Sequence, residues 1–370
     1  MDLSVLMQSF NIKGRLVTLV PFGNGNINDT FLAVYRNTFT ETQVVLQRVN
    51  RAVFPRPEVI MANMHKITLH CHAKLENDAK RGLDDRVWQM PRIIKTKEGG
   101  DFIRDEKGEV WRVITRILSA HAFDTAQSPE HALECGCALG HFHYLLSDMP
   151  PNSIEDPLPG FHVTSGYLRQ YDRTLKSKRA QSLLSASVEA KRLAKYIDER
   201  RNLALCLERA ERAGELKRRM FHGDPKVNNI MIDDFTGKGT AMIDLDTVSP
   251  GLVQIDVGDA VRSICNPAGE EESNLGKVAF DENLFLAFMK GYMREAGAFM
   301  TEADREYLYD TVRLLPFELG LRFFQDYLAG DRYFKTRQPG QNLNRARVQF
   351  RLCESIEARE GSIREMLKRL

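Results

Sequence analysis

The sequence of 370 residues has little of the features that mark nucleic-acid-binding, membrane or secreted proteins. Its charges nearly cancel, with 52 basic against 50 acidic side chains and a formal net charge of +2, so we expect no nucleic-acid partner. Its most apolar stretches, residues 284–289 and 314–324, are short or are interrupted by charged residues, so we expect no membrane partner. The first 14 residues lack a signal-peptide pattern, which predicts a cytoplasmic location.

Cysteine is also sparse, and six scattered cysteines in a chain of this length argue against a disulfide framework. Cys135, Cys137, His141 and His143 are of the residue types that bind zinc, but the residues around them predict a helix. Residues two apart on a helix point in different directions, so we interpret these four as packing residues rather than zinc ligands. The sequence contains no internal repeat and no low-complexity segment.

The order of the predicted elements divides the chain in two, and its length is sufficient for two hydrophobic cores. The first part is rich in predicted strands, with one helix that begins at Pro57. Helical patterns dominate from Ser128 onward, apart from one strand pair at 229–233 and 240–245. We therefore predict an α+β fold with a small β-rich N-terminal lobe, residues 1–117, and a larger, mostly helical C-terminal lobe, residues 118–370.

The strongest functional pattern is Phe221–Asn229, which has the His-x-Asp-x-x-x-x-Asn spacing of a kinase catalytic loop. Phosphoryl transfer requires that the attacking hydroxyl is oriented, that its proton is received and that a metal ion holds the phosphate charge. We expect Asp224 to receive the proton, His222 to brace the loop and Asn229 to bind Mg²⁺. Lys226 fits a γ-phosphate contact and a solvent-facing side chain equally well.

A second pattern, residues 241–246, ends in Asp-Leu-Asp and follows a turn-rich loop that joins the two predicted strands. A symmetric register pairs Asp233 with Thr240 and sets Asn229 opposite Asp244. Side chains that are directly opposite in an antiparallel pair lie about 4.5–5.5 Å apart. We therefore predict that an amide oxygen and a carboxylate meet here as ligands of one Mg²⁺, with Asp246 on the same face of the strand.

A third pattern lies between the first two predicted strands and alternates glycine with asparagine. Glycine lets backbone amides approach phosphates closely, although such a segment alone also fits an ordinary hairpin turn. Its position ahead of the catalytic loop favours nucleotide binding. The candidate residues are Gly23, Asn24, Gly25, Asn26 and Asn28.

Together these three segments resemble the aminoglycoside phosphotransferase and choline kinase superfamily, and within it the N-acetylhexosamine 1-kinases. The similarity runs almost from end to end of the chain. It covers residues 23–30, 45–50, 111–112, 161–162, the catalytic loop, 243–248, 322–334 and 342–346.

The resemblance implies a protein-kinase-like two-lobe fold, with ATP and Mg²⁺ as cofactors and a small molecule as the partner. Asp224 would be the catalytic base, and Asn229 and Asp244 would bind Mg²⁺. The adenine-binding hinge would be residues 114–118, which include Thr115, Arg116 and Ile117. The implied substrate is an N-acetylhexosamine, phosphorylated at its anomeric hydroxyl by a monomer or homodimer.

The chain departs from the kinase pattern on the third strand, where Gln47 and Arg48 stand in place of the usual lysine. Because neighbouring strand residues point to opposite faces, only one of them enters the cleft. We predict that it is Arg48, since the α- and β-phosphates need a cation there. The helix predicted over residues 57–69 has a glutamate only in its first turn, at Glu58, so it lacks the glutamate that usually pairs with that lysine.

The substrate candidates are side chains that suit a sugar, namely carboxylates, guanidinium groups and aromatic rings. Arg322 and Asp326 could instead form an exposed ion pair, because they are four residues apart on a predicted helix. The other candidates are Tyr327, Asp331, Tyr333 and, in a loop, His162.

Two alternatives to a sugar kinase remain open. One is a kinase for an aminoglycoside, an amino alcohol or choline, and the other is a nucleotide-binding regulator without transfer activity. The mixture of arginine with aspartate in residues 322–333 favours a neutral polyol over a polycation. The intact set of Asp224, Asn229 and Asp244 argues against a regulator, because binding without chemistry needs no base.

Overall fold

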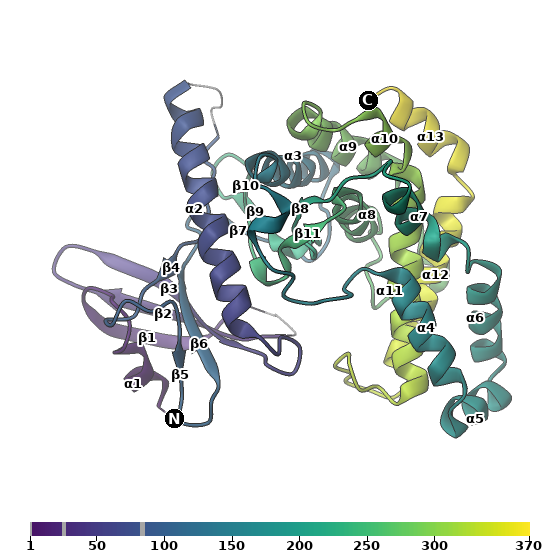
Figure 1. Cartoon of the computed structure of the whole chain (residues 1–370), viewed down its shortest axis with the longest axis horizontal. Helices are drawn as coiled ribbons and strands as arrows, with labels where there is room; N and C mark the ends of the chain where they lie inside the picture. The colour runs from purple at the N-terminus through teal and green to yellow at the C-terminus, as the bar shows by residue number, and fades with distance from the viewer. Residues whose placement is uncertain (1, 24–26, 82–85) are drawn as a thin grey trace.

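The computed structural model describes residues 2–23, 27–81 and 86–370 (Figure 1). Its N-terminal lobe is built on an antiparallel sheet in which the strands lie in the order β1-β2-β3-β6-β4, with β5 also paired to β6. The strands are β1 Arg15–Pro21, β2 Asp29–Arg36, β3 Glu41–Val49, β4 Ile93–Ile94, β5 Ile103–Arg104 and β6 Val110–Thr115.

The two faces of this sheet pack against different helices. Val44 and Leu46 of β3 pack with Trp111 of β6 and with residues of α1, Leu3–Met7. Val49 lies on the opposite face of β3 and packs with α2, Pro57–Arg81. Because side chains alternate along a strand, even-numbered residues of β3 face α1 and odd-numbered residues face α2.

The C-terminal lobe is mostly helical, and two short sheets form the side that faces the N-terminal lobe (Figure 1). One sheet has the order β10-β9-β7, and in the other β11 pairs with β8. These strands are β7 Ala120–His121, β8 Arg219–Phe221, β9 Ile230–Asp233, β10 Gly239–Met242 and β11 Ser249–Gly251. The helices are α3 Pro129–Leu146, α4 Thr164–Leu175, α5 Lys178–Ala186, α6 Val188–Glu199, α7 Cys206–Arg212, α8 Val253–Ile264, α9 Glu282–Ala296, α10 Glu302–Glu306, α11 Leu308–Ala329, α12 Gln341–Glu357 and α13 Glu360–Lys368.

Helices α3 and α9 cross closely because glycine stands at the contact on both helices. A Cβ atom at Gly136 would lie 2.0 Å from the carbonyl oxygen of Phe288, and one at Gly291 would lie 2.0 Å from that of Leu133. Cys135 and Cys137 are buried in the same helix pair. Among the residues that the structure describes, no group of three histidine, cysteine or acidic side chains could hold a metal ion.

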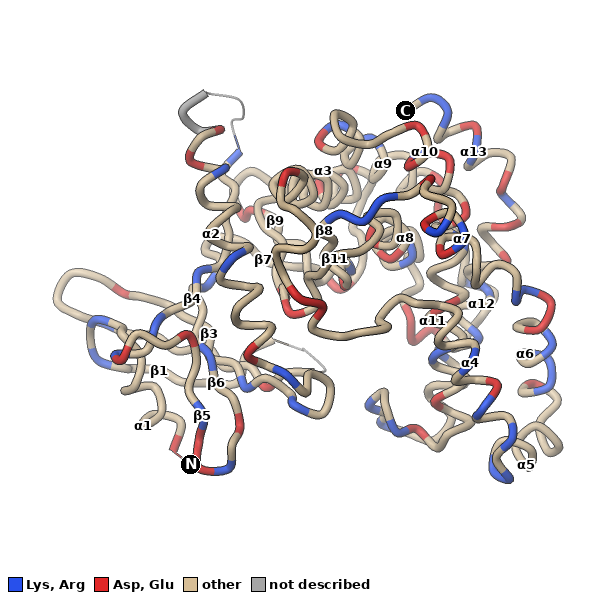
Figure 2. The backbone as a smooth tube through the Cα atoms, in the orientation of Figure 1, with Lys and Arg blue, Asp and Glu red and all other residues tan. Residues whose placement is uncertain are grey.

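The predicted α+β fold of two lobes is confirmed. The chain leaves the N-terminal sheet at Thr115 and enters the first C-terminal strand at Ala120. Lysine and arginine are interspersed with aspartate and glutamate along the backbone of both lobes (Figure 2). Within the described ranges, no helix is long and apolar enough to cross a membrane.

Candidate active site

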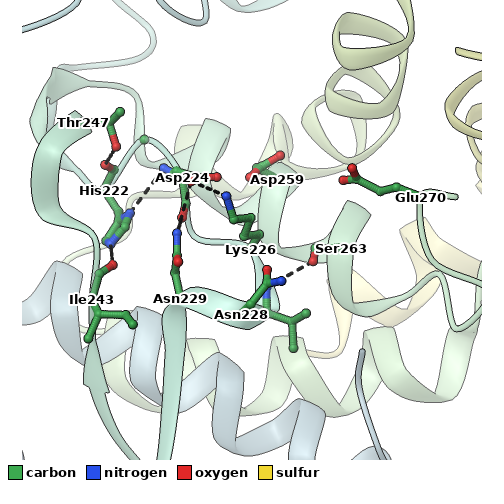
Figure 3. Close-up of polar contacts among 12 residues, drawn as sticks. His222, Asp224, Lys226, Asn228, Asn229, Ile243, Thr247, Asp259, Ser263 and Glu270 are labelled. Atoms are coloured by element: carbon green, nitrogen blue, oxygen red, sulfur yellow. Dashed lines mark hydrogen bonds and ion pairs between the residues drawn. The ribbon is translucent and has the colours of Figure 1, made fainter. Parts of the chain in front are cut away.

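The loop between β8 and β9 carries the catalytic motif, and His222 holds it from within (Figure 3). The buried imidazole donates from Nε2 to the carbonyl oxygen of Ile243 at 2.9 Å. Its Nδ1 accepts the backbone N–H of Asp224 at 3.2 Å. Burial also lowers the pKa of His222, which favours the neutral ring that these two contacts require.

Asp224 lies at the centre of the loop, where Lys226 and Asn229 both point toward it (Figure 3). The Lys226 ammonium is 2.7 Å from Oδ2 of Asp224, and the Asn229 amide donates to the same oxygen at 3.1 Å. Burial would raise the pKa of Asp224, but the charge of Lys226 outweighs it, so the pKa lies below its ordinary value. Asp224 is therefore an ionised acceptor, and its side chain is 28% exposed.

Asp256 of α8 anchors the backbone of the loop from beneath. Its carboxylate accepts the N–H groups of His222 and Gly223 at 2.5 and 2.8 Å. His143 of α3 lies 2.8 Å from the same carboxylate, and both side chains are fully buried. Sequence reasoning missed Asp256, although an acidic residue within the apolar stretch 252–261 was a usable signal.

The predicted register of the β9–β10 hairpin is wrong by one residue. Met231 pairs with Ala241 rather than with Met242, and the carbonyl of Asn229 accepts the N–H of Ile243 rather than facing Asp244. Next to the turn the difference from the prediction is two residues, because Gly239 pairs with Ile232, and a bulge at Thr240 reduces it to one. The carbonyl oxygen of Thr240 accepts the N–H of Gln89 at 2.8 Å.

Asp244 enters the cleft by its backbone conformation instead of by strand alternation. Its φ of +63° and ψ of +60° are left-handed, a conformation that aspartate tolerates better than most residues. Desolvation by the surrounding protein, followed by the charges of Asp246 and Asp224, raises the pKa of the Asp244 carboxyl to about 7. The negative charges of Asp224 and Asp246 therefore act on the Asp244 carboxyl.

The residues present fit a magnesium ion. No residue that the structure describes donates a hydrogen bond to the Asp244 carboxylate, which leaves its oxygens available. The side-chain N–H groups of Asn229 are used on Asp224, so its amide oxygen is the atom left for a cation. An amide oxygen and one carboxylate, completed by phosphate oxygens, make a donor set that Mg²⁺ prefers.

The prediction that Arg48 enters the cleft is wrong. Arg48 shares the α1 face of β3 with Leu46, and there it pairs with Asp29 and Glu109 at the surface. Gln47 lies on the α2 face, as the alternation of β3 requires.

The cation on the cleft side is Arg112 of β6, which is 1% exposed. It donates to the Gln47 side-chain oxygen from Nε and Nη2, at 3.0 and 2.8 Å. Its Nη2 also forms an ion pair of 2.5 Å with Asp246, which is 3% exposed. Arg112 thus joins the N-terminal sheet to the segment that follows Asp244, where a 3-10 turn and not strand alternation orients Asp246.

The glycine-rich segment reaches the same carboxylate. Asn28 donates to Oδ2 of Asp246 at 2.8 Å, while its own oxygen accepts the N–H of Asn50. Gly23 has a φ of +76°, which suits a turn between β1 and β2. The candidates Asn24, Gly25 and Asn26 lie outside the described residues.

The hinge candidates begin at Thr115, the last residue of β6. Ile117 is buried, and the Thr115 hydroxyl accepts the backbone N–H of Arg92 at 2.9 Å. Arg116 donates to Gln43 and lies over the ring of Phe22.

A cavity of about 600 Å³ lies in the C-terminal lobe between the loop before α4, helix α11 and the loop after it. Arg173, Arg322 and Arg332 line it. The guanidinium of Arg322 lies 4.8–5.7 Å from the centres of four aromatic rings. Of the predicted substrate residues, Arg322, Asp326 and Tyr333 line this cavity, whereas Tyr327, Asp331 and His162 do not. The rings around Arg322 belong to Phe161, Tyr167, Tyr333 and Phe334.

Asp326 holds a loop rather than offering a free carboxylate. It accepts the backbone N–H groups of residues 332–334, each at 2.9 Å, and the side-chain amide of Asn342 at 3.1 Å. Asp326 is 2% exposed and forms no ion pair with Arg322, so the alternative of an exposed pair is wrong too. The carboxylate of Asp331 accepts a second bond from Asn342.

Comparison with protein-family models identifies the family of this chain. The model of the phosphotransferase enzyme family matches residues 18–295. The chain is a member of that family. The phosphotransferase shares its fold with an aminoglycoside phosphotransferase from Alicyclobacillus acidocaldarius, with 15% identity, a TM-score of 0.59 and coverage of 98% of this chain and 96% of the other.

Two further structures share the phosphotransferase fold. One is a spectinomycin phosphotransferase in complex with ADP and spectinomycin, with 12% identity, a TM-score of 0.56 and coverage of 97% and 98%. The other is a choline kinase from Cryptosporidium parvum, with 12% identity, a TM-score of 0.57 and coverage of 94% and 91%. At these identities the similarity establishes the fold and leaves the acceptor to be argued from the site.

Proposed function

We propose that this phosphotransferase is an ATP- and Mg²⁺-dependent kinase that transfers the γ-phosphate to a hydroxyl group of a small molecule. The observation that carries the proposal is the grouping of an ionised acceptor, Asp224, with the amide of Asn229 and the carboxylate of Asp244. These are the proton acceptor and the two cation ligands that phosphoryl transfer needs from a protein.

Each residue of this group has a defined task. Asp224 keeps a low pKa, so it is ionised at neutral pH and can align the acceptor hydroxyl by accepting its hydrogen bond. Lys226, already 2.7 Å from Asp224, brings a positive charge to the point where the γ-phosphate would arrive. The bound Mg²⁺ would neutralise the charge that develops on the phosphate.

The nucleotide would bind to the N-terminal part of the site. We assign adenine to the hinge at residues 115–117, and the phosphates to the glycine-rich segment that ends at Asn28. The ADP in the related spectinomycin phosphotransferase supports a nucleotide in this fold. On this assignment residues 1–117 form the nucleotide-binding lobe, and the C-terminal lobe supplies the acceptor site.

The acceptor is proposed to be a sugar, with the anomeric hydroxyl of an N-acetylhexosamine as the specific candidate. Aromatic rings and the donors of Arg322 and Gln325 line the cavity, and such groups suit the faces and hydroxyls of a pyranose. Among the described residues that line the cavity, Asp326 is the one carboxylate, and it accepts hydrogen bonds from residues 332–334 and Asn342, which disfavours a polycationic aminoglycoside. The aromatic rings already surround Arg322, which disfavours the quaternary ammonium of choline.

The test is a panel of acceptors with ATP and Mg²⁺, read by ADP release and by mass spectrometry of the products. Hexosamines, simple hexoses, aminoglycosides, amino alcohols and choline form the panel. Turnover confined to hexosamines supports the specific candidate, and turnover confined to an amine-bearing antibiotic would exclude it. ATP binding without turnover of any acceptor would favour a regulator and overturn the proposal of a kinase.

A further inference from the structure

His162 lies between the catalytic loop and helix α11, although it was predicted to contact the substrate. Its Nε2 is 2.9 Å from the carbonyl oxygen of Gly223, and its Nδ1 is 2.8 Å from Oε1 of Glu318. The side chains of His162 and Glu318 are 6% and 3% exposed. This burial leaves the ring little surface for a substrate, and both ring nitrogens are occupied by protein partners, so the prediction of a substrate contact is corrected.

The partners of this ring determine its charge. A carbonyl oxygen and a carboxylate oxygen are both acceptors, so both ring nitrogens of His162 must carry hydrogen. A neutral ring that donates to Gly223 would instead direct a lone pair at the carboxylate of Glu318. The second oxygen of Glu318 accepts the hydroxyl of Thr164, so this oxygen also acts as an acceptor. With Glu318 ionised, this geometry fits an imidazolium paired with a carboxylate.

The surrounding charges support this assignment. Burial would lower the pKa of His162, but the charge of Glu318, with a smaller contribution from Asp259, raises it above the ordinary value in spite of Arg322. Burial would raise the pKa of Glu318, and His162 with Arg322 holds it below the ordinary value. The rings of Phe161 and Phe221 carry no charge. The hydroxyl of Tyr167 accepts the backbone N–H of His162 at 3.2 Å, and burial raises the pKa of Tyr167 to about 12, so this neighbour is also neutral.

The peptide that His162 holds is the one that leads into Asp224. The carbonyl of Gly223 is bonded to His162, and the N–H of Asp224, on the same peptide unit, is bonded to His222. Gly223 has a φ of +84°, and a Cβ atom there would lie 2.9 Å from the carbonyl oxygen of Thr247. Both ends of a rigid peptide plane are thus fixed, and this plane sets the direction of the Asp224 side chain.

We propose that His162 is a positioning residue, which as an imidazolium paired with Glu318 orients the Gly223–Asp224 peptide and makes turnover depend on its protonation. The inference rests on the proposed function, because Asp224 is taken as the base. Protonation of His162 is complete below its pKa, so kcat is retained there. The value of kcat falls as the pH rises through that pKa, which lies above the usual histidine value of about 6.5.

The first experiment measures kcat from pH 6 to pH 10 with saturating ATP, Mg²⁺ and acceptor. Glu318→Gln removes the carboxylate, so the alkaline limb should move to lower pH by about 1–3 units. His162→Gln should lower kcat at pH 7 by about 100-fold through misplacement of the base, abolish this limb and leave both KM values within threefold. His121→Gln alters an exposed histidine that pairs with Asp234, and it should keep the wild-type profile.

An alkaline limb that is unchanged in Glu318→Gln would overturn the inference. A second measurement does not depend on turnover. The imidazole ¹⁵N spectrum of the whole protein distinguishes an imidazolium, with two protonated nitrogens, from a neutral ring. The signal of His162 is identified among those of the nine histidines as the one that Glu318→Gln changes. A His162 signal of a cation at pH 7 supports the inference, and that of a neutral tautomer refutes it. If no acceptor is phosphorylated, the proposed function fails while the charge of His162 is still decided.

Discussion

Replacing Arg112 by methionine should destabilise the N-terminal lobe by about 3–5 kcal/mol, the usual cost of removing one partner of a buried ion pair. Asp246 is 3% exposed and would keep its charge without a counter-ion. The side-chain oxygen of Gln47 would also lose two donors, at 3.0 and 2.8 Å. Methionine has a similar length, and it would lie beside Met61 and Met64, so an empty cavity contributes little to this loss.

Arg48→Met is the matched control. Its side chain is 40% exposed and pairs with Asp29 and Glu109 at the surface, where such pairs contribute about 0–1 kcal/mol. The double variant Arg112→Met/Asp246→Asn should recover a large part of the loss, because the unpaired buried charge is then absent.

The assay is urea unfolding followed by the fluorescence of Trp111, which precedes Arg112 on β6. Trp88, the other tryptophan of the chain, is replaced by phenylalanine in every variant. The KM for ATP is measured in parallel. Equal destabilisation by Arg112→Met and Arg48→Met would refute the role of the buried pair. If Arg48→Met raised the KM for ATP tenfold and Arg112→Met did not, Arg48 would be the residue that contacts the phosphates.

Three further predictions concern the base, the acceptor loop and the helix contact. Asp224→Asn should lower kcat by about 10²–10⁴-fold because no group receives the proton. The affinity for ATP, measured by calorimetry, should be unchanged. A wild-type kcat in this variant would mean that another residue is the base. Asp326→Ala should lower the free energy of unfolding by about 3 kcal/mol, since its carboxylate accepts several hydrogen bonds. It should also raise the KM for the acceptor more than the KM for ATP. Equal changes in both KM values would contradict a local effect on the acceptor loop. Gly136→Ala should cost about 3 kcal/mol or more because its Cβ would meet backbone at 2.0 Å. Gly361→Ala, in open space on α13, should instead raise the melting temperature, and similar melting temperatures would contradict the close crossing.

The parts of this protein that the sequence determined by itself are those encoded by neighbouring residues. The two lobes followed from a change of periodicity, since strand and helix patterns depend on residues two to four apart. Residues 222–229 are contiguous, so their spacing alone brings His222, Asp224 and Asn229 into one loop. The helix starts at Pro57 and Ser128 were equally local, because a cap or a proline acts within one turn.

Tertiary structure decided the features that depend on residues far apart in the chain. The hairpin register includes a bulge at Thr240, whose carbonyl oxygen contacts Gln89 outside the hairpin, and the spacing of the hairpin residues does not predict that bulge. Strand alternation showed that only one of Gln47 and Arg48 could enter the cleft, but which face meets α2 was decided by packing.

The partners of the polar side chains around the site were also determined by tertiary structure. Asp326 changed from a substrate candidate to the anchor of a loop because its partners stand six to sixteen residues away. Arg112 faces Asp246 from another lobe, and His162 meets Glu318 across 156 positions of sequence. A buried charge needs a partner wherever the fold can supply one. Such pairs form only when segments that are distant in the sequence pack together, so local periodicity does not predict them.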